Sequence, residues 1–448
     1  MKKNILSRRD FVKNTGILTG SLMAAPLFSR QNFFPAGNEE IKVAVIGCGG
    51  RGTGAAAQAL SVKQNTKLVA MADAFKDNLD ECYKKLTGSD AKNLADSVGL
   101  DIRTRVQVPE ENKFHSFDAY KKAIALADVV ILTTPPGFRP IHFEEAIKQG
   151  KHVFMEKPVA TDPAGIKKVL EMAEVAKSKK LNVVVGLQRH YQKVYRELMK
   201  RVYDGKIGDI VSGQVYWNND GVWVRPRKEG QTEMEYQMRN WYYFNWLCGD
   251  HINEQHIHNI DVMNWAKNAY PVRAQGMGGR TTRVGKEYGE IFDHHFVEFE
   301  YADGSILNSQ CRHQKGTMSR VDEMLVGTKG SVKFGAGLMK GTNGKVIYKH
   351  EGKGDPNPYQ VEHDELFEAI AKGEYRFADA ENGAKSTMTS ILGRMATYSG
   401  QVIEWDKAIN SGISLQPAAY DWQTNPPILP DANGMYPAAI PGKTKFFT

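Results

Sequence analysis

Residues 41–60 constrain the fold of this 448-residue chain most, because a strand pattern, a glycine-rich turn and a helix pattern follow one another there. Residues 41–46 hold five apolar residues in six, which is typical of a strand buried on both faces. Gly47, Gly49 and Gly52 follow; these glycines permit a tight turn, a close approach of backbone to pyrophosphate, and close packing of helix on strand. The pattern predicts a dinucleotide whose phosphates lie at the helix N-terminus.

The next strand ends in a carboxylate. Residues 67–72 predict this strand, and Asp73 ends it about 20 residues beyond the glycines. A carboxylate there accepts hydrogen bonds from the ribose hydroxyls and repels a 2′-phosphate, which favours NAD over NADP. The alternative is a glycine turn in another α/β fold, with Asp73 capping a helix.

The first 37 residues are typical of a targeting segment. Residues 7–13, Ser-Arg-Arg-Asp-Phe-Val-Lys, match the twin-arginine export pattern, and a weakly apolar stretch follows at residues 15–28. That stretch is too short and too polar to span a bilayer. We therefore expect a signal peptide and linker at residues 1–37, the twin-arginine export machinery as a partner, a periplasmic location and no stable membrane anchor. A basic amphipathic tail on a cytosolic protein is the alternative.

Export of a folded protein also bears on the cofactor. No nicotinamide pool exists outside the cytoplasm, so we expect the NAD to be held tightly and regenerated within the catalytic cycle. The four cysteines are scattered without paired spacing, which indicates neither a zinc ribbon nor a disulfide framework.

The charge of the chain gives no support for nucleic-acid binding. The formal net charge is +8, but the first 37 residues carry six basic residues against one acid, which leaves about +3 for the rest. A body with nearly balanced charge has no basic surface large enough to favour nucleic acid or membranes.

Strand and helix patterns alternate over residues 40–187, which predicts an α/β fold with a doubly wound parallel sheet of the Rossmann type. Residues 88–113 are polar and irregular and read as a surface insertion. Ligands bind at the carboxyl ends of such strands, where Gly47, Asp73, Thr134 and Glu156 all fall.

Three motifs together resemble the Gfo/Idh/MocA oxidoreductase family: the glycine loop, the turn Thr134-Pro135-Pro136, and residues 150–158, Gly-Lys-His-Val-Phe-Met-Glu-Lys-Pro. The resemblance implies that Lys157 lies beside the nicotinamide and the substrate hydroxyl, where an ammonium stabilises the alkoxide formed as hydride leaves. A surface salt-bridge lysine is the alternative. The expected cofactor-binding residues are Gly47, Gly49, Gly50, Arg51, Gly52, Asp73, Thr134, Pro135, His142, Glu156, Lys157 and Gln188.

Residues 188–417 predict a substrate-binding α+β domain with a predominantly antiparallel open sheet and helices on one face. In the resembled family the open face makes dimer contacts, which implies a homo-oligomer. Residues 418–448 are rich in Pro, Asn and Gly and read as an extended tail over the surface.

Residues 246–265 carry the expected catalytic groups of this domain. Glu254, His258 and Asp261 have the spacing of one helix face. By resemblance His258 is the general base and Asp261 is structural. Glu254 stands where the family usually has Asp, and it either orients the base or binds a neighbouring hydroxyl. A metal bound by His251, Glu254 and His258 is the rival interpretation, but metal is not part of the family's usual mechanism, so we expect none.

Aromatic and basic residues in the second domain suit a carbohydrate, although loop packing explains many of them almost as well. The expected substrate-binding residues are Arg189, Tyr191, Trp223, Arg239, Trp241, His256 and Arg312.

These observations predict an NAD-dependent oxidoreductase that transfers hydride between a sugar or glycoside hydroxyl and tightly bound nicotinamide. The alternative is an NAD-dependent glycoside hydrolase that works by transient oxidation, elimination and re-reduction; against it, the sequence shows no second well-placed acid–base pair. A binding protein that has lost turnover is a third possibility, against which Lys157 and His258 argue.

Overall fold

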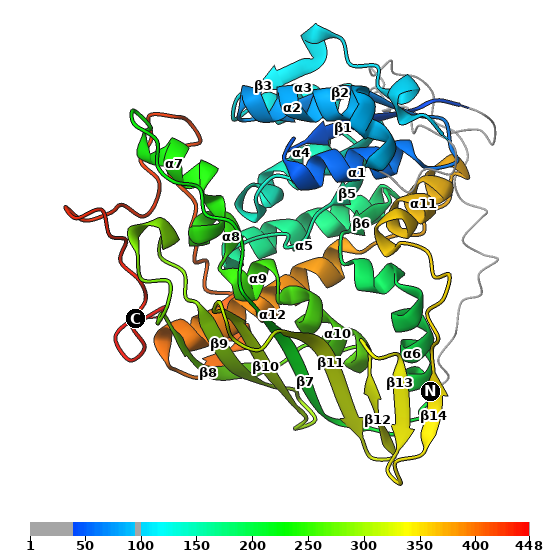
Figure 1. Ribbon diagram of the computed structural model, residues 1–448, viewed down its shortest axis with the longest axis vertical. Coiled ribbons are helices and arrows are strands. Elements are labelled where there is room, and N and C mark those ends of the chain that lie inside the picture. Colours follow the sequence, from blue (N-terminus) through cyan, green and yellow to red (C-terminus); the bar gives the residue numbers. More distant parts are fainter. Residues whose placement is uncertain (1–38, 95–99, 448) are drawn as a thin grey trace, which may run out of the picture.

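The computed structural model describes residues 39–94 and 100–447. Two sheets, one above the other, form two domains with helices between them (Figure 1). The expected signal peptide lies outside the described residues, as does part of the insertion at residues 88–113. In the described ranges, no helix is both long enough and apolar enough to cross a membrane.

The first sheet confirms the predicted Rossmann-type fold. Its six strands lie in the order β3-β2-β1-β4-β5-β6, and each neighbouring pair is parallel. The strands are β1 (Ile41–Ile46), β2 (Thr66–Asp73), β3 (Lys113–His115), β4 (Val129–Leu132), β5 (His152–Met155) and β6 (Val183–Val185). The helices that alternate with them are α1 (Gly50–Leu60), α2 (Lys76–Thr87), α3 (Ala119–Ala125), α4 (Arg139–Lys148) and α5 (Pro163–Ser178).

The second sheet is mixed but mostly antiparallel, as predicted. Its nine strands follow the order β14-β13-β12-β11-β7-β10-β9-β8-β15, and the central pair β7 and β10 is parallel. The strands are β7 (Ile210–Asn219), β8 (Arg273–Gly279), β9 (His294–Glu300), β10 (Ile306–His313), β11 (Arg320–Gly327), β12 (Gly330–Lys333), β13 (Leu338–Gly341), β14 (Val346–Lys349) and β15 (Ile403–Glu404).

Helices of the second half cover one face of this sheet and separate it from the first domain (Figure 1). The helices of this half of the chain are α6 (Lys193–Tyr203), α7 (Glu233–Arg239), α8 (Asn245–Cys248), α9 (His251–Glu254), α10 (Ile257–Lys267), α11 (Pro358–Ala371), α12 (Ala380–Ser399) and α13 (Trp405–Ile409). Of these, α9, α10, α12 and α13 contact strands of the second sheet. Helix α12 packs on both α5 and β8. One continuous hydrophobic core therefore joins the two domains.

Helix α11 belongs to the first domain, although the sequence pattern placed it in the second. It packs against α1, and its Leu366 and Phe367 share a hydrophobic core with Val43 and Leu60. The chain therefore passes between the two domains more than once, whereas the sequence pattern divided them at a single point, residue 187.

The C-terminal segment contains no helix or strand between residues 410 and 447, and it contacts both domains. The Leu415 amide donates to Asp162 Oδ2 at 2.8 Å, and the ring of Trp422 lies 4.6 Å from that of Phe117. This tail is thus part of the tertiary structure near the site.

Candidate active site and cofactor chamber

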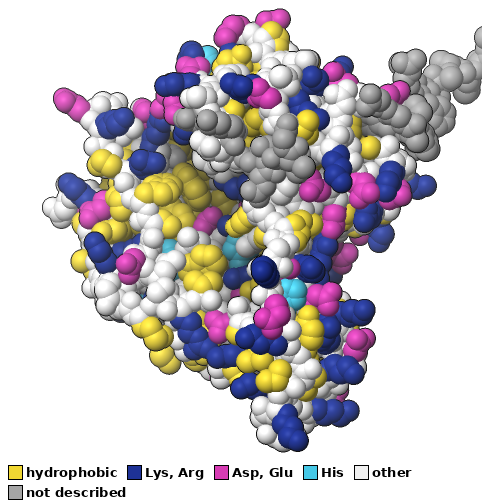
Figure 2. Space-filling model, turned by 45° about the vertical axis from the view of Figure 1, so that its right-hand side comes forward, with side chains coloured by type: hydrophobic (Ala, Val, Ile, Leu, Met, Phe, Trp, Pro, Cys, Tyr) yellow, Lys and Arg dark blue, Asp and Glu magenta, His cyan; other side chains and the backbone are white. Residues whose placement is uncertain are grey.

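A cavity of about 820 Å³ opens at the carboxyl edge of β1, β2 and β4, within the usual size range of small-molecule sites. Figure 2 shows a hollow between the two domains in which hydrophobic side chains gather. The glycine loop forms one end of the cavity. Gly47 has φ +97°, and a Cβ on it would lie 2.5 Å from the Thr134 amide nitrogen, so only glycine fits there.

The N-terminus of α1 fits a pyrophosphate. Gly49 caps the helix without a side-chain hydrogen bond, and a Cβ placed on Gly49 or Gly50 would meet nothing within 4 Å. Both glycines line the cavity, so the first amides of the helix face open space where phosphate oxygens can accept from them. Gly52 has the predicted packing role, because a Cβ there would lie 1.8 Å from Gly47 O.

Asp73 lies at the cavity wall, where the sequence placed it. Its carboxylate accepts from the Cys48 amide at 2.6 Å and from the Phe75 amide at 2.9 Å. Burial raises the pKa of Asp73, while these backbone donors partly offset that shift. The carboxylate is therefore fixed in orientation at the end of β2, where ribose hydroxyls are expected.

Eight of the expected cofactor residues line this cavity, and four do not. Those that line it are Gly47, Gly49, Gly50, Arg51, Asp73, Thr134, Pro135 and His142. Of the other four, Gly52 packs behind the loop, Glu156 pairs with Arg51, Lys157 reaches the second domain, and the Oε1 atom of Gln188 is buried without a partner.

His142 contributes a neutral ring to the cavity. Burial, with a further effect of the Arg139 charge, lowers the pKa of His142 to about 3. Its Nδ1 hydrogen-bonds to Thr134 Oγ1 at 3.1 Å, and its ring stacks on Phe138. Thr134 and His142 thus form a rigid polar edge at the end of β4.

The opposite wall of the cavity comes from the second domain and includes three of the residues expected around the substrate. Trp223, Arg239 and Trp241, expected around the substrate, line the cavity that holds the cofactor loop. The long segment after β7 turns back over the first domain and so brings these residues opposite Asp73.

Lys157 and Glu254 form a contact between the two domains that the sequence did not predict, since Glu254 was expected to orient His258 or to bind a substrate hydroxyl. Lys157 follows β5, and its Nζ donates to the Glu254 carbonyl at 2.8 Å and to Glu254 Oε1 at 3.2 Å. Both side chains are 14% exposed. An ammonium has three donors, so one remains for a substrate oxygen while Glu254 fixes the other two.

His258 lies in the second domain, close enough to Lys157 for the ammonium charge to affect its pKa. Burial, followed by the positive charge of Lys157, holds the pKa of His258 well below its ordinary value, so the imidazole is neutral. The ring stacks on Trp217 with centroids 6.0 Å apart, and its Nδ1 is buried without a hydrogen-bond partner. A neutral imidazole can accept a proton, which is the predicted role.

The helix that the sequence predicted through these residues is broken. Helix α9 ends at Glu254 and α10 begins at Ile257, so Glu254 and His258 do not share one continuous helical face. The break turns the Glu254 carbonyl toward Lys157, where a continuous helix would hydrogen-bond it internally. Asp261 has the predicted structural role, since it hydrogen-bonds to His190 Nε2 at 2.6 Å and accepts from Ser386 Oγ at 2.7 Å.

The remaining four residues expected around the substrate are held in other contacts. Arg189 pairs with buried Glu323 at 2.5 Å, and the Tyr191 hydroxyl donates to Asp379 at 2.7 Å. His256 Nε2 hydrogen-bonds to Ser309 Oγ at 2.7 Å.

Arg312 donates to the Met318 carbonyl at 2.9 Å. Buried and partly exposed residues alternate along β10, and Arg312 is on the opposite face from its buried neighbours Cys311 and His313. Arg189, His256 and Arg312 make these contacts within the second domain, whereas the Tyr191 ring lies in the hydrophobic core of the first domain.

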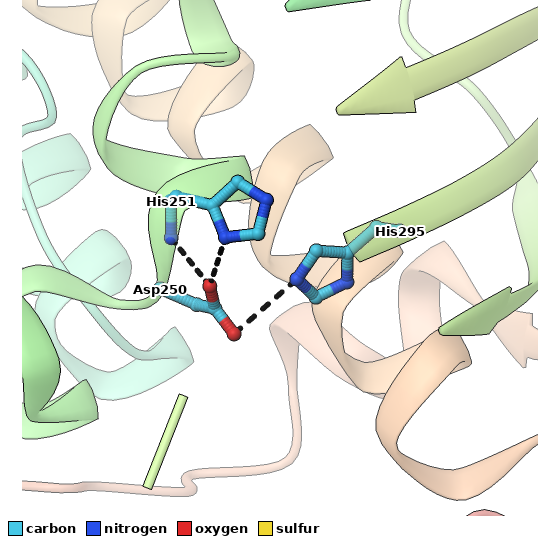
Figure 3. A group of neighbouring side chains, drawn as sticks. All are labelled: Asp250, His251 and His295. Atoms are coloured by element: carbon cyan, nitrogen blue, oxygen red, sulfur yellow. Dashed lines mark hydrogen bonds and ion pairs between the residues drawn. The ribbon is translucent and has the colours of Figure 1, made fainter. Parts of the chain in front are cut away.

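A buried histidine network lies beneath the site, and the sequence did not predict it. Asp250 hydrogen-bonds to His251 Nδ1 at 2.8 Å and pairs with His295 Nε2 at 3.3 Å (Figure 3). The Phe292 amide and the Tyr398 hydroxyl also donate to the Asp250 carboxylate. Although burial opposes ionisation, the two histidines hold the pKa of Asp250 well below its usual range.

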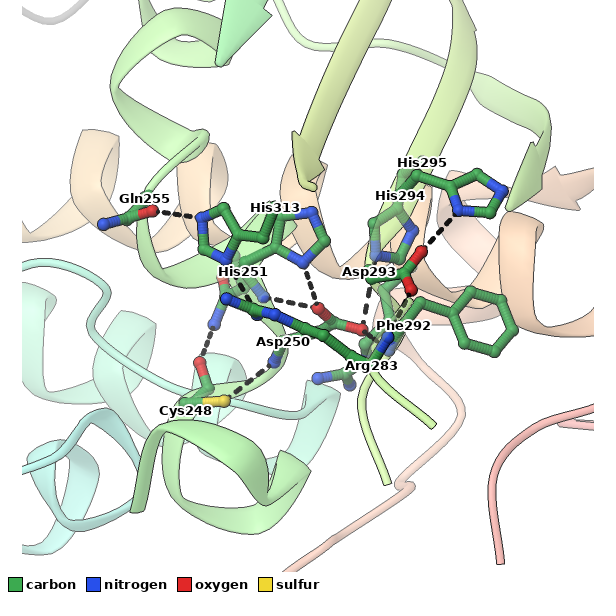
Figure 4. A network of polar contacts seen from close by, with 12 residues as sticks. Cys248, Asp250, His251, Gln255, Arg283, Phe292, Asp293, His294, His295 and His313 are labelled. Atoms are coloured by element: carbon green, nitrogen blue, oxygen red, sulfur yellow. Dashed lines mark hydrogen bonds and ion pairs between the residues drawn. The ribbon is translucent and has the colours of Figure 1, made fainter. Parts of the chain in front are cut away.

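This network connects to the catalytic region through His313, which stacks on His251 and hydrogen-bonds to Gln255 Oε1 at 2.6 Å (Figure 4). The rival metal triad is not assembled: His251 belongs to this network, Glu254 binds Lys157, and His258 stacks on Trp217. Protein donors already occupy both oxygens of Asp250, which favours a structural role for the network.

Sequence reasoning missed two further residues beside the expected catalytic groups. The Tyr242 hydroxyl and Trp217 Nε1 are buried without hydrogen-bond partners. Tyr242 is close enough to Glu254 for the carboxylate to raise the tyrosine pKa further, after burial, which is the main cause. The sequence signal was the aromatic run at residues 241–244, which gives no indication of which ring faces the site.

The glycine turn, the carboxylate at the end of β2 and the cavity between them define the chain as an NAD-binding oxidoreductase. Residues 41–186 match the model of the Gfo/Idh/MocA family, described as an oxidoreductase family with an NAD-binding Rossmann fold.

The chain is similar to inositol 2-dehydrogenases along most of its length. That of Cereibacter sphaeroides is 24% identical over 364 residues, which cover 78% of this chain and 92% of the relative. That of Rhizobium meliloti is 23% identical over 280 residues, which cover 62% and 70%.

Two solved structures show the same fold. The aldose-aldose oxidoreductase of Caulobacter crescentus has a TM-score of 0.63 at 18% identity and covers 82% of this chain and all of its own. The scyllo-inositol dehydrogenase of Lactobacillus casei, with bound NAD(H) and scyllo-inositol, has a TM-score of 0.61 at 20% identity and the same coverage.

Proposed function

We propose that this protein transfers hydride between a secondary hydroxyl of a sugar or cyclic polyol and a bound NAD. The observation that carries the proposal is the Lys157–Glu254 contact, which joins the NAD-binding domain to the second domain beside a neutral His258. The named relatives are inositol 2-dehydrogenases, and their substrate class fits an ammonium and an imidazole that can hold a hydroxyl.

Three residues of the chain have separate roles in the proposed reaction. His258 takes the hydroxyl proton, and the Lys157 ammonium stabilises the negative charge that develops on the same oxygen. Glu254 keeps the ammonium oriented through its side chain and its carbonyl. Bound NAD supplies the hydride acceptor.

Hydride chemistry with net oxidation or reduction is favoured over glycoside hydrolysis. The matched family and the named relatives are oxidoreductases. The elimination route needs a further acid–base pair beside the leaving group. The Asp–His pair that precedes Glu254 in the chain, Asp250 with His251, is fully buried.

The test is to purify the protein with its cofactor and add inositols, aldoses and glycosides separately. A keto product together with the near-ultraviolet absorbance of NADH supports the proposal. Release of a free aglycone without net redox change would support the hydrolase instead. A protein that binds a sugar without changing it, with NAD present, would exclude both.

We also propose that residues 1–37 direct export through the twin-arginine route. The support is the Arg8-Arg9 pair with Phe11 and Lys13. Cell fractionation tests it: replacing Arg8 and Arg9 together by Lys should leave the protein in the cytoplasm, and a periplasmic double variant would contradict export by this route.

A homo-oligomer through the open face of the second sheet is a further proposal. It is supported by the family resemblance and by Met277 on β8, whose side chain is 70% exposed. Replacing Met277 by Glu should shift the sedimentation coefficient toward that of a monomer. A wild-type protein that sediments as a monomer would exclude the oligomer.

A further inference from the structure

We infer that residues 220–241 and the C-terminal tail form a permanent cover over the adenosine end of the NAD site, so that the cofactor stays bound from one turnover to the next. We call residues 220–241 the lid segment. The inference rests on the proposed NAD dependence and adds which parts of this chain retain the cofactor.

The lid segment supplies one wall of the cavity. Trp223 and Trp241 lie against each other with ring centroids 5.8 Å apart, and both line the cavity opposite the glycine loop. Arg225 lies over the Trp223 ring, and Lys228 also lines the cavity. Two indoles and two cations suit the adenine ring and the pyrophosphate of a dinucleotide.

A direct contact holds the lid segment on the first domain. Arg239 makes two hydrogen bonds of 2.9 Å to the carboxylate of Asp77, and its guanidinium lies 3.6 Å from the ring centroid of Phe75. Phe75 and Asp77 are two and four residues after Asp73, which is the expected ribose acceptor. The contact therefore lies across the mouth of the adenosine site.

The C-terminal tail holds the lid segment from its other side. Gln237 donates to the Ile428 carbonyl at 2.7 Å, and Arg227 donates to the Tyr436 hydroxyl at 3.1 Å. The ring of Phe244, just beyond the lid segment, packs on Tyr436 at 4.9 Å. The lid segment is thus attached along its length to residues far away in the sequence.

The tail in turn is anchored to the first domain beneath the same site. Trp422 packs on Phe75 and Phe117, with centroids 5.1 and 4.6 Å away, and both phenylalanines line the cavity. First domain, lid segment and tail therefore form a closed ring of contacts around the adenosine end. We expect these contacts to slow the release of a bound dinucleotide, because the lid segment must move away from the first domain before the adenosine end is fully exposed.

The test uses the purified holoenzyme and measures the rate at which bound NADH is displaced by excess NAD, followed by NADH fluorescence. Arg239→Ala removes both the ion pair and the stacking contact, and we expect release about tenfold faster. Trp422→Ala, which removes the support beneath Phe75 and Phe117, should also accelerate release. The control Arg273→Ala removes the ion pair of Arg273 with Glu300, far from the cavity, and should not change the rate.

Exchanging the two charges of the Arg239–Asp77 ion pair distinguishes loss of this contact from a general disruption of the fold. Asp77→Arg alone should accelerate NADH release, and combining it with Arg239→Asp should restore the ion pair and slow release again, but not fully, because the stacking of Arg239 on Phe75 is lost. Equal release rates in wild type, Arg239→Ala and Trp422→Ala would overturn the inference while leaving NAD dependence intact. Release in the wild type that is faster than turnover would overturn it as well. Failure to bind NAD at all would instead overturn the proposed function, and this inference with it.

Discussion

Lys157 carries the positive charge that the proposed reaction needs. Replacing Lys157 by Met keeps the length of the side chain but removes the ammonium, so kcat should fall about a hundredfold or more, as when an oxyanion donor is lost. NAD retention should be unchanged, because Lys157 does not line the adenosine cavity. Rates from NADH absorbance and cofactor content after gel filtration check both. An active Lys157→Met variant would exclude this role.

The lowered pKa of His258 determines how kcat should depend on pH. Its pKa in the folded protein is well below the ordinary value, mainly because of burial. The base is active when neutral, so activity is lost only when the pH falls through this depressed value. The acid limb of kcat should therefore lie below pH ~6.5, the ordinary histidine value. A limb at or above that value would contradict the assignment, and His258→Gln should remove the limb together with most of the activity.

The buried hydroxyl of Tyr242 leads to a prediction about the stability of the protein. Its buried hydroxyl has no protein partner, so Tyr242→Phe removes an uncompensated polar group and should raise the free energy of unfolding by about 1 kcal/mol. Tyr191→Phe is the matched control, because the Tyr191 hydroxyl donates to Asp379, and it should lower stability by a similar amount. Urea unfolding measures both. Destabilisation by Tyr242→Phe would show that its hydroxyl has an unseen partner.

Among the elements, the strand–turn–helix unit of β1 and α1 was predicted most completely, because each of its glycines is required by local geometry. Gly47 and Gly52 leave no room for a Cβ, and that constraint is visible in the sequence. Strand β3 was missed, since its three residues are too few to show a period. The break between α9 and α10 was missed as well, because the helical spacing continues through it and a tertiary contact with Lys157 decides it.

Two glycines of α1 test this local argument. Gly52→Ala places a Cβ 1.8 Å from Gly47 O, so it should displace the glycine loop and abolish NAD binding or folding. Gly54→Ala, half a turn away, meets only the end of Arg51 at 3.5 Å. It should stabilise the helix by about 1 kcal/mol, since alanine has the higher helix propensity. Circular dichroism and NAD titration distinguish the two; a tolerated Gly52→Ala would contradict the packing argument.

At the scale of the whole molecule, the sequence predicted the two sheets but not how the parts surround the cofactor. Trp223, Arg239 and Trp241 read as carbohydrate ligands because aromatic and basic side chains suit either a sugar or a dinucleotide. The structure places them at the NAD cavity because the segment after β7 folds back over the first domain. The anchoring of Trp422 on Phe75 is a contact between distant parts of the chain, and no local pattern predicts it.

Buried neutral histidines determine how the whole molecule responds to acid. Burial lowers the pKa of both His142 and His256 to about 3, whereas in the unfolded chain the value returns to about 6.5. Below pH ~6.5 the unfolded state therefore binds more protons, and each of these histidines lowers the free energy of unfolding by up to about 1.4 kcal/mol per pH unit. Urea midpoints should accordingly fall between pH 7 and pH 5. His142→Gln should flatten this dependence, whereas replacing exposed His115 by Gln should leave it unchanged. Identical midpoints at the two pH values would mean that these rings already bind protons in the folded state.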